Sequence, residues 1–266
     1  MNAQTLWQDC TLIRERAPLV HSITNYVVMN STANAVLALG GSPVMAHATE
    51  EMPDMVALTK AVGGALVINI GTLSPAWIDG MAAAMTAARQ QGVPIVFDPV
   101  GAGATPYRTQ TCTELLTRNP ATIIRGNAAE IMALHDASQQ TKGVDSHQTA
   151  DAARDAAAAL AKAYDCVVSV SGPTDLITNG TDACTVPYGH PLMPRVTGLG
   201  CTASALTGAF AAVNPDPLVA AHHAMTVMGI CGAIAGDQAA GPGSLQMHFL
   251  DALHNLDEAT LVARLG

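Results

Sequence analysis

The chain is organised around Arg195-Val196-Thr197-Gly198-Leu199-Gly200-Cys201-Thr202-Ala203-Ser204-Ala205. Two closely spaced glycines, then Cys201 and a run of helix-forming residues through Ala212, predict a flexible loop that turns directly into a helix. The first backbone N–H groups of a helix lack partners and carry partial positive charge, so they attract anions. Gly198 and Gly200 allow the backbone to approach an anion closely, beside Cys201. The alternative is an ordinary strand-to-helix loop whose cysteine is a small buried apolar residue.

The composition predicts one domain with little surface charge. No linker rich in Ser, Gly or Pro and no charge block divides residues 1–266, so we expect a single domain. Only 12% of the residues are charged, against about 25% in typical proteins, which favours a homo-oligomer that hides part of its surface. The net charge of -9 and the absence of a Lys/Arg cluster argue against nucleic-acid binding. An anionic ligand therefore requires a metal ion and backbone dipoles.

The six cysteines are widely spaced, without a C-x-x-C pair or a histidine at zinc-ligand spacing. Charged residues at 9 and 14–16 interrupt any apolar run near the start, so we expect no signal peptide, reduced thiols and a cytoplasmic protein. Residues 218–236 carry no formal charge and are nearly long enough to cross a bilayer. Because they are rich in Ala and Gly and contain two histidines, we expect a closely packed core helix and no membrane contact. Gly232 and Gly236 would then let a neighbouring element approach.

Apolar runs and helical patterns alternate along the chain. Strands are expected at 19–25, 43–45, 65–71, 94–98, 122–124 and 166–170. Helices are expected at 4–16, 29–39, 50–62, 75–91, 109–116, 128–135 and 149–163, and from Cys201, Pro217 and Gln246 onward. Asn179-Gly180 predicts a hairpin between 175–178 and 184–187. The alternation predicts an α/β fold with a parallel sheet covered by helices on both faces.

Such folds bind ligands beyond the carboxyl ends of their strands, so the residues that follow the strands become candidates for chemistry. We expect these residues to gather in one cleft. They are Asn25, Met45, Asn69–Gly71, Asp98, Arg125, Glu130, Ser171 and Gly198–Cys201.

Asp98-Pro99-Val100-Gly101-Ala102-Gly103 places a carboxylate and two glycines directly after a predicted strand. This is not a dinucleotide fingerprint, because Pro106 follows the glycines and no helix start is expected there. A carboxylate at this position suits Mg²⁺ held through water. The alternative is that Asp98 only makes a turn before Pro99.

Arg125-Gly126-Asn127-Ala128-Ala129-Glu130 pairs a cation for phosphate oxygens with a second carboxylate. The planar fork of an arginine suits this task because it can bond two oxygens at once. Alternatively, Asn127 caps a helix and Glu130 completes a capping box, and both roles can coexist. The chain has no G-x-x-x-x-G-K-[ST], H-E-x-x-H or G-x-S-x-G motif, which argues against a P-loop enzyme, a zinc peptidase and a serine hydrolase.

With these residues assembled, the chain resembles the hydroxyethylthiazole kinase family, ribokinase-like enzymes of thiamine salvage. The resemblance covers nearly the whole chain. It is carried by residues 18–25, 37–40, 42–45, 98–103, 125–127 with Glu130, 142–145 and 241–244. It implies a ribokinase-like α/β fold with a mostly parallel central sheet, helices on both faces and a small antiparallel hairpin.

The resemblance also implies an activity, which is transfer of the ATP γ-phosphoryl group to the primary hydroxyl of 5-(2-hydroxyethyl)-4-methylthiazole. The implied roles are substrate contact for Met45, Gly198 and Asn25, ATP contact for Arg125 and Ser171, organisation of Mg²⁺ for Asp98 and Glu130, and a catalytic position for Cys201, where most ribokinase-like enzymes place an aspartate base. It further implies a homotrimer with active sites between subunits. Under that arrangement, Asn25 and Met45 come from one subunit and Gly198–Cys201 from its neighbour.

The sequence departs from the family pattern at two places, and two other functions are possible alternatives. Ser171-Gly172-Pro173 stands where the family usually has Thr-Gly-Glu, which removes a carboxylate, and Leu199 replaces a smaller residue. Cys201 could instead be a covalent nucleophile in an amide or thioester hydrolase, activated at a helix start with a nearby histidine. That hypothesis does not account for the carboxylates and the arginine together. A non-catalytic thiazole or nucleotide sensor is the third hypothesis, and the loss of a carboxylate at Pro173 favours it.

Overall fold

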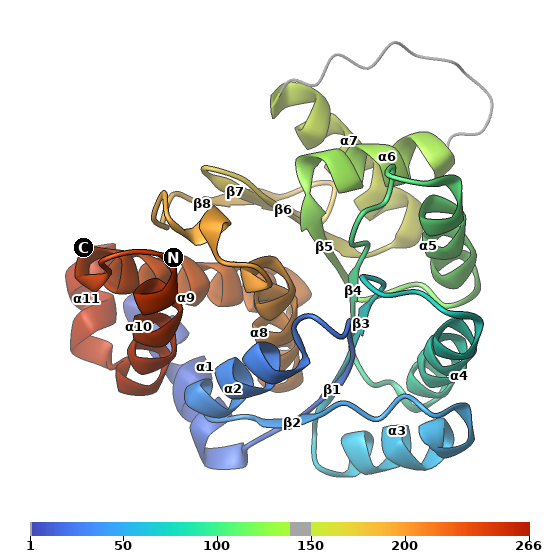
Figure 1. Cartoon of the computed structure of the whole chain (residues 1–266), viewed down its shortest axis with the longest axis horizontal. Helices are drawn as coiled ribbons and strands as arrows, with labels where there is room; N and C mark the ends of the chain where they lie inside the picture. The colour runs from blue at the N-terminus through green and yellow to red at the C-terminus, as the bar shows by residue number, and fades with distance from the viewer. Residues whose placement is uncertain (1, 139–149) are drawn as a thin grey trace.

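An eight-stranded sheet runs through the middle of the computed structural model, which describes residues 2–138 and 150–266 (Figure 1). The strand order is β2-β1-β3-β4-β5-β6-β7-β8. The strands are β1 (Leu19–Ile23), β2 (Ser42–Val44), β3 (Ala65–Asn69), β4 (Ile95–Asp98), β5 (Ile123–Asn127), β6 (Val167–Ser171), β7 (Asp175–Thr178) and β8 (Ala183–Val186). Strands β1 to β6 pair in parallel, whereas β7 and β8 are antiparallel to their neighbours. The predicted mostly parallel sheet with a hairpin is confirmed.

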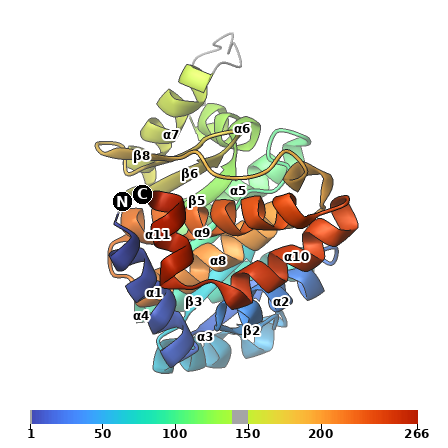
Figure 2. The same ribbon diagram turned by 90° about the vertical axis from the view of Figure 1, so that its left-hand side faces the viewer.

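Helices cover both faces of the sheet, and a hydrophobic core lies on each face. One face carries α3 (Met52–Ala61), α4 (Pro75–Gln91), α5 (Pro106–Arg118), α6 (Ala128–Ser138) and α7 (Ala150–Tyr164). The other face carries α1 (Ala3–Arg16), α2 (Met29–Leu39), α8 (Leu199–Val213), α9 (Pro217–Gln238), α10 (Pro242–Asn255) and α11 (Glu258–Leu265). Two short 3₁₀ helices, η1 (Thr49–Glu51) and η2 (Met193–Arg195), lie in the connections. Figure 2 shows α10 and α11 on the outside of the second layer, over α8 and α9.

Alternation along the strands decides which polar residues face α8. Val67, Val96 and Ile123 belong to the core on the α8 face, whereas Leu66 and Ile95 belong to the opposite core. Because strand side chains repeat with a period of two, the residues two positions further on, at 69, 98 and 125, also face α8. The register pairs Asn69 with Asp98, so this polar row lies at the carboxyl ends of β3, β4 and β5.

Helices α8 and α9 pack closely because small residues line them. A Cβ atom on Gly208 of α8 would lie 2.6 Å from Val67 Cγ2 on β3. In α9, Cβ atoms on Gly232 and Gly236 would overlap Met193 and His190 of the preceding loop, which confirms the expected close approach. Helix α9 is long and apolar enough to span a membrane, but 72% of its apolar window is buried within the protein. It is a core helix, as predicted.

Some boundaries differ from those expected. Helix α5 begins at Pro106, directly after the glycines of residues 98–103, so the expectation that no helix starts there was wrong. Thr105 caps this helix and Pro106 suits its first position, because proline lacks the N–H that would stay unpaired. Strand β5 continues through Asn127 because its last residues remain paired with β6, which places Arg125 inside the strand.

Other differences are smaller. The expected helix over 50–62 is divided into η1 and α3, α10 begins at Pro242 rather than Gln246, and α8 begins at Leu199 rather than Cys201. The sequence patterns did not predict α11 or η2. Residues 142–145, which contribute to the family resemblance, and the first expected residue of the helix over 149–163 lie outside the described residues.

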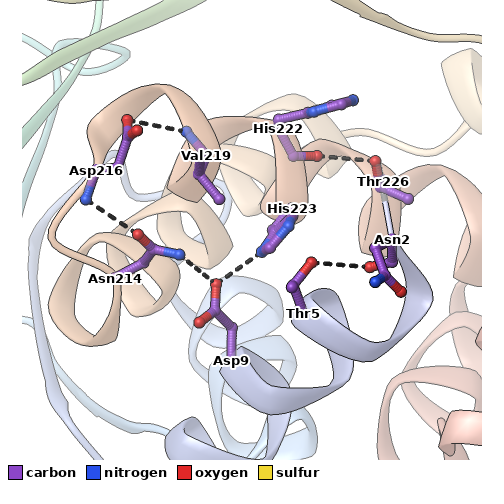
Figure 3. Close-up of polar contacts among 9 residues, drawn as sticks. All are labelled: Asn2, Thr5, Asp9, Asn214, Asp216, Val219, His222, His223 and Thr226. Carbon is purple, nitrogen blue, oxygen red and sulfur yellow. Dashed lines mark hydrogen bonds and ion pairs between the residues drawn. The ribbon is translucent and has the colours of Figure 1, made fainter.

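A buried polar cluster ties α1 to the turn between α8 and α9 (Figure 3). Asp9 Oδ2 accepts hydrogen bonds from His223 Nδ1 and from Asn214 Nδ2, each at 2.7 Å. Asn214 is the C-cap of α8, and its Oδ1 accepts the backbone N–H of Asp216, the N-cap of α9. We call Asp9, Asn214 and His223 the amino-end cluster, because it lies at the far end of α8 from the carboxyl ends of the strands.

Candidate active site

Four buried polar side chains form a continuous hydrogen-bonded row beneath the first turn of α8. Asn25 Nδ2 donates to Asn69 Oδ1 at 3.0 Å, and Asn69 Nδ2 donates to Asp98 Oδ2 at 2.9 Å. Ser204 Oγ, from α8, donates to the same Asp98 oxygen at 2.7 Å. All four side chains are at most 5% exposed. We call Asn25, Asn69, Asp98 and Ser204 the carboxyl-end row, and it confirms that residues after β1, β3 and β4 meet.

Asp98 is a carboxylate in an unusually dry place. Burial raises its pKa to about 6, against the opposing effect of the Arg125 charge and the Ser204 and Asn69 hydrogen bonds, while Glu130 raises it slightly further. No ion pair reaches Asp98 within residues 2–138 and 150–266. The negative charge is thus held by neutral donors and is only partly compensated.

Cys201 lies next to this row on the first turn of α8. Its Sγ accepts a hydrogen bond from Asn25 Nδ2 at 3.4 Å. Burial and the nearby Asp98 charge raise the pKa of the thiol, although hydrogen bonds from Asn69 and Asn25 oppose the shift. The thiol is therefore protonated at neutral pH, which is opposite to the activation that a nucleophilic cysteine requires.

The contact between Asn25 and Cys201 corrects one expectation about assembly. Both residues belong to the same chain and touch within it. Asn25 therefore cannot reach this cysteine from a neighbouring subunit, and the expected division of the site between Asn25 and residues 198–201 was wrong. The local reason is that the loop after β1 turns back across the start of α8 on the same face of the sheet.

Arg125 joins β5 and β6 to the start of α8. Its Nη1 donates to Gly200 O at 2.8 Å, and its Nη2 donates to Ser171 Oγ at 2.6 Å. A Cβ on Gly200 would lie 3.0 Å from Nη1, so the glycine makes room for the guanidinium. The side chain is 7% exposed, and its Nε is a buried donor without a partner among the described residues. A cation therefore lies directly beneath the N–H groups of the helix start.

Glu130 performs the capping role that its spacing predicted. Asn127 Oδ1 accepts the Glu130 N–H at 2.9 Å, and Glu130 Oε2 accepts the Asn127 N–H at 2.9 Å. The other oxygen, Oε1, accepts the N–H of Gly101 at 2.8 Å and so ties the loop after β4 to α6. The capping box is confirmed, and both oxygens of the carboxylate accept backbone N–H groups.

Gly198 and Met45 occupy the periphery of this arrangement. Gly198 is the N-cap of α8 in the left-handed region, with a φ of 87°, and its missing Cβ makes room for Val28. Met45 follows β2, and His21 Nε2 fixes this segment by donating to the next carbonyl, Ala46 O, at 2.8 Å. The described contacts do not join Met45 to the carboxyl-end row, so its substrate role stays a prediction.

An aromatic group borders the same loops. The Trp77 ring packs against Tyr26 at 4.8 Å and against His47 at 4.7 Å between centroids. Tyr26 and its neighbour Val27 are 63% and 69% exposed, so they present apolar surface beside the buried polar site.

Arg108 is a residue that sequence reasoning missed, as it missed the role of Ser204. Its Nη1 donates to Ile70 O and Val100 O, at 3.0 and 2.9 Å, and its Nη2 donates to Gly71 O at 3.0 Å. It therefore fixes the loops after β3 and β4 together. The signal was present only as an arginine early in a helix, and nothing local indicates carbonyl partners so distant in sequence.

The carboxylate oxygens at the site suit a hard cation that takes most of its ligands from a nucleotide and water. Among the described residues, no group of three or more His, Cys, Asp or Glu side chains could hold a metal ion. Asp98 and Glu130 supply carboxylate oxygens, which are the ligands that Mg²⁺ prefers, and this ion commonly takes its remaining ligands from phosphates and water. The pair therefore suits Mg²⁺ brought by a nucleotide rather than a permanently bound ion.

A hollow of about 330 Å³ lies at the opposite end of the sheet. Its lining includes Pro94, Thr122 and Asn214, which lie at the amino ends of the strands and at the end of α8. None of the residues expected to carry chemistry lines it. The convergence of polar groups, and not the size of a hollow, identifies the site.

Comparisons with known proteins agree with one another. The family described as hydroxyethylthiazole kinase matches residues 10–259. A hydroxyethylthiazole kinase of Syntrophus aciditrophicus is 54% identical, covering 98% of this chain and 96% of that protein. The structure of a hydroxyethylthiazole kinase from Pyrococcus horikoshii superposes with a TM-score of 0.89 at 41% identity, covering 97% of this chain and 96% of that one. A pyridoxal kinase of Staphylococcus aureus, at 16% identity and a TM-score of 0.60, covers 81% of this chain and 88% of its own and shares the fold.

Proposed function

The chain belongs to the hydroxyethylthiazole kinase family, and we propose that it transfers the γ-phosphoryl group of ATP to the primary hydroxyl of 5-(2-hydroxyethyl)-4-methylthiazole. The observation that carries the proposal is 54% identity to a kinase of that name over 98% of the chain. The hydroxyl oxygen forms a bond to the γ-phosphorus, the bond to the β–γ bridging oxygen breaks, and the hydroxyl proton is released. The products are ADP and 4-methyl-5-(2-phosphooxyethyl)thiazole, a precursor for thiamine phosphate synthesis.

Charge neutralisation is the main task of the residues at this site. Phosphoryl transfer passes through a loose transition state, so positioning and compensation of charge matter more than a strong base. Arg125 and the N–H groups at the start of α8 supply positive charge to the transferred group. Ser171 holds Arg125 in place and contributes a hydroxyl near the nucleotide. In a dry site these donors act without reorganising.

Asp98 and Glu130 are the residues that hold Mg²⁺, which neutralises the phosphate oxygens when it is bound with ATP. Asp98 presents a rigid carboxylate from the end of β4, anchored from two sides. Glu130 fixes the loop after β4 and faces the same region. Asp98 therefore sets the position of the ion, and Glu130 sets the shape of the loop after β4.

Cys201 acts as a polar neighbour of the reacting hydroxyl. Its protonated thiol, held by Asn25, is not a strong base, and the loose transition state does not need one. Met45, Gly198 and Asn25 border the thiazole, with the aromatic group around Trp77 beside them. The Asn25 amide donates to Asn69 and to Cys201, and its Oδ1 accepts the Val27 N–H, so we expect it to contact the thiazole through the carbon atoms of its side chain.

The assembly we propose is a homotrimer in which Met45 of one subunit completes the site of its neighbour. Tyr26 and Val27, exposed beside the site, supply apolar surface for such a contact, and the low charge content supports it. The six cysteines are all free thiols, which supports a reducing, cytoplasmic location.

One experiment tests the activity. Purified protein is incubated with ATP, with and without Mg²⁺ and with and without the thiazole alcohol, and ADP and the phosphorylated thiazole are quantified. We expect ADP and product in equal amounts only when all components are present. Cleavage of an amide or thioester with untouched ATP would establish the hydrolase instead, and tight binding of thiazole or ATP without turnover would establish a sensor.

Complementation tests the shared site. Met45→Arg blocks the thiazole side, and Arg125→Ala with Gly198→Asp disables the phosphate side, so each homotrimer should be nearly inactive. In a closed ring with head-to-tail contacts, every mixed trimer has one junction where both surfaces are unmutated. Refolding the two variants together should restore a sizeable fraction of activity. Mixed trimers seen by native mass spectrometry that stay inactive would place each site within one subunit.

A further inference from the structure

Asn69, at the carboxyl end of β3, is bonded at both ends of its side-chain amide. Its Oδ1 accepts Asn25 Nδ2 and the backbone N–H of Gly71, each at 3.0 Å, and its Nδ2 donates to Asp98 Oδ2 at 2.9 Å. The side chain is 1% exposed. Two donors on one side and an acceptor on the other allow a single amide orientation, because a flipped amide would face N–H groups with N–H groups.

The same contacts select which oxygen of Asp98 is available. Within the described residues, both hydrogen bonds to this carboxylate end on Oδ2, one from Asn69 and one from Ser204. A carboxylate anchored by one oxygen through two donors cannot rotate without losing both. Oδ1 is therefore the oxygen that remains for a ligand, and its direction is set by Asn69 and Ser204.

On its other side, Asn69 supports the group that faces the alcohol. Asn25 donates one amide hydrogen to Asn69 Oδ1 and another to Cys201 Sγ, so the position of the first bond determines the second. This arrangement requires a glycine at position 71, because a Cβ there would lie 2.6 Å from Asn25 Nδ2 and 2.8 Å from Asn25 Cγ. The backbone at 71 is thus shaped around the Asn25 amide.

We propose that Asn69 is a positioning residue that holds the cation side of the site, through Asp98, and the alcohol side, through Asn25 and Cys201, in fixed relation, with Ser204 as the second anchor of Asp98. The inference rests on the proposed kinase activity for its catalytic consequence. The Asn69 amide positions Cys201 and Asp98 whether or not the protein has that activity. Misplacement of reacting groups by about 1 Å can cost on the order of a hundredfold in rate.

The experiment uses Asn69→Ala in the full-length protein, with Asn119→Ala as the matched control. Asn119 is also a buried asparagine with a side-chain hydrogen bond, but it caps the C-terminus of α5, away from the site, and its amide donates to Thr86 of α4. Circular dichroism and thermal unfolding establish that both variants are folded. Ser204→Ala serves as a second variant, because Asp98 then keeps Asn69 but loses its other donor. Its control is Ser22→Ala, since Ser22 is a buried serine whose hydroxyl has no hydrogen-bond partner among the described residues.

The first readout is the rate of Cys201 alkylation by iodoacetamide in the free protein, measured by peptide mass spectrometry at neutral pH. Losing the Asn69 amide releases Asn25, whose Nδ2 donates to Cys201 Sγ, so the thiolate loses support and alkylation should slow by about fivefold, as expected for one weak hydrogen bond. Asn119→Ala should leave the rate unchanged. This measurement needs neither ATP nor metal, so it tests the placement of Cys201 even if the kinase assay fails.

The second readout is a double-mutant cycle on kcat. Asn69→Ala alone should lower kcat about a hundredfold with KM for both substrates within about threefold, and Ser204→Ala about tenfold. On an Asp98→Asn background, Asn69→Ala should lower kcat by less than about tenfold, because the residue it positions is already altered. Unchanged alkylation in Asn69→Ala, or losses that multiply independently in the cycle, would overturn the proposal. A wild-type protein without kinase activity would reject the proposed function alone.

Discussion

Helix α8 carries a buried polar cluster at each end, and the two clusters are built on opposite principles. At its C-terminus, Asp9 meets His223 and Asn214, so the carboxylate has a potential cationic partner at 2.7 Å. At its first turns, the Asp98 carboxylate accepts hydrogen bonds from the neutral donors Asn69 and Ser204, and no ion pair reaches it in the part of the chain that the structure describes. A carboxylate that is already paired with a cationic group has little remaining affinity for a cation, whereas an unpaired carboxylate can still bind one.

The difference shows where the fold carries the energetic cost of function. The amino-end cluster lies where α1, α8 and α9 meet, and nothing in the proposed reaction uses it. The carboxyl-end row keeps a carboxylate dry enough for its pKa to rise to about 6. Sites that bind charge commonly sacrifice stability in this way. The two clusters should therefore respond in opposite ways to the loss of their carboxylates.

The largest effect is expected from Asp98→Asn. In the free protein, the raised pKa means that the native state holds the Asp98 proton more tightly than the unfolded chain does. The stability that the protonated Asp98 contributes is fully present below about pH 4 and is lost as the pH rises toward 6. The difference between its native and unfolded pKa values corresponds to about 3 kcal/mol in the free energy of unfolding. Asp98→Asn should remove this loss, so the variant should become more stable than wild type above pH 6.

Activity should move the other way. Without the carboxylate, kcat should fall on the order of a hundred- to a thousandfold, the range found when one preorganised charge-stabilising group is removed. Chemical denaturation of the metal-free protein at pH 4 to 8 and ADP assays at neutral pH measure the two effects. Taking the difference between variant and wild type cancels the opposing titration of His222, whose pKa burial and the neighbouring His223 lower to about 4. A variant that is less stable at every pH would contradict the comparison.

Asp9→Ala should break the other cluster with the opposite result. Removing one partner of a buried pair typically costs about 3–5 kcal/mol, because the remaining polar groups stay buried without a partner. Denaturant unfolding should show this loss, while kcat in the folded fraction should stay within about twofold of wild type. His223→Ala should produce a similar loss, since both substitutions break the same contact. A fall in kcat larger than the change in folded fraction would show that the amino-end cluster influences the site.

Local pattern predicted one cluster well and could not predict the other. Three residues of the carboxyl-end row lie at the carboxyl ends of buried strands, so the strand patterns located Asn25, Asn69 and Asp98, and the fold rule brought them together. The fourth, Ser204, lies in α8, and no strand pattern indicated its bond to Asp98. The capping box of Asn127 and Glu130 was equally readable, because its partners are three residues apart.

Long-range pairings gave no such signal. Asp9 and His223 lie 214 positions apart, and nothing near either residue indicates the other. Arg108 bonds carbonyl groups of two different loops, so its role depends on how α5 lies against both. Gly200 was expected to admit an anion, which stays a prediction, and in the structure its missing Cβ makes room for the Arg125 guanidinium. Periodicity describes one element at a time, whereas these contacts depend on where separate elements meet.

Cys201 offers a smaller test on the functional side. Since burial and Asp98 keep the thiol protonated, it cannot supply most of the acceleration, and Cys201→Ala should lower kcat only about tenfold. Cys201→Asp should retain activity, because a carboxylate at that place can accept the hydroxyl proton. Steady-state kinetics of both variants, with circular dichroism as the folding control, decide the matter. Complete loss of activity in both folded variants would contradict the role of Cys201 as a polar neighbour.

The smallest effect is expected from Pro173→Glu, which asks whether the carboxyl end of the sheet is short of one negative charge. Pro173 is exposed in the bend after β6, and Asp175 Oδ1 holds this bend by accepting the Gly172 N–H at 3.0 Å. A glutamate there would add the carboxylate that the family resemblance implies for this position, at a place open to solvent. Because exposed charge pairs contribute only about 0.2–1 kcal/mol, the apparent affinity for Mg·ATP should tighten by about two- to fivefold.

Pro173→Gln is the matched control, since it removes the proline without adding charge. Isothermal titration at low and high salt separates the effect of the added charge from the effect of losing the proline. A gain in Pro173→Glu that salt abolishes would show that the carboxyl-end row still lacks charge for its cation. Equal affinities in the two variants would show that Asp98 and Glu130 suffice without a third carboxylate.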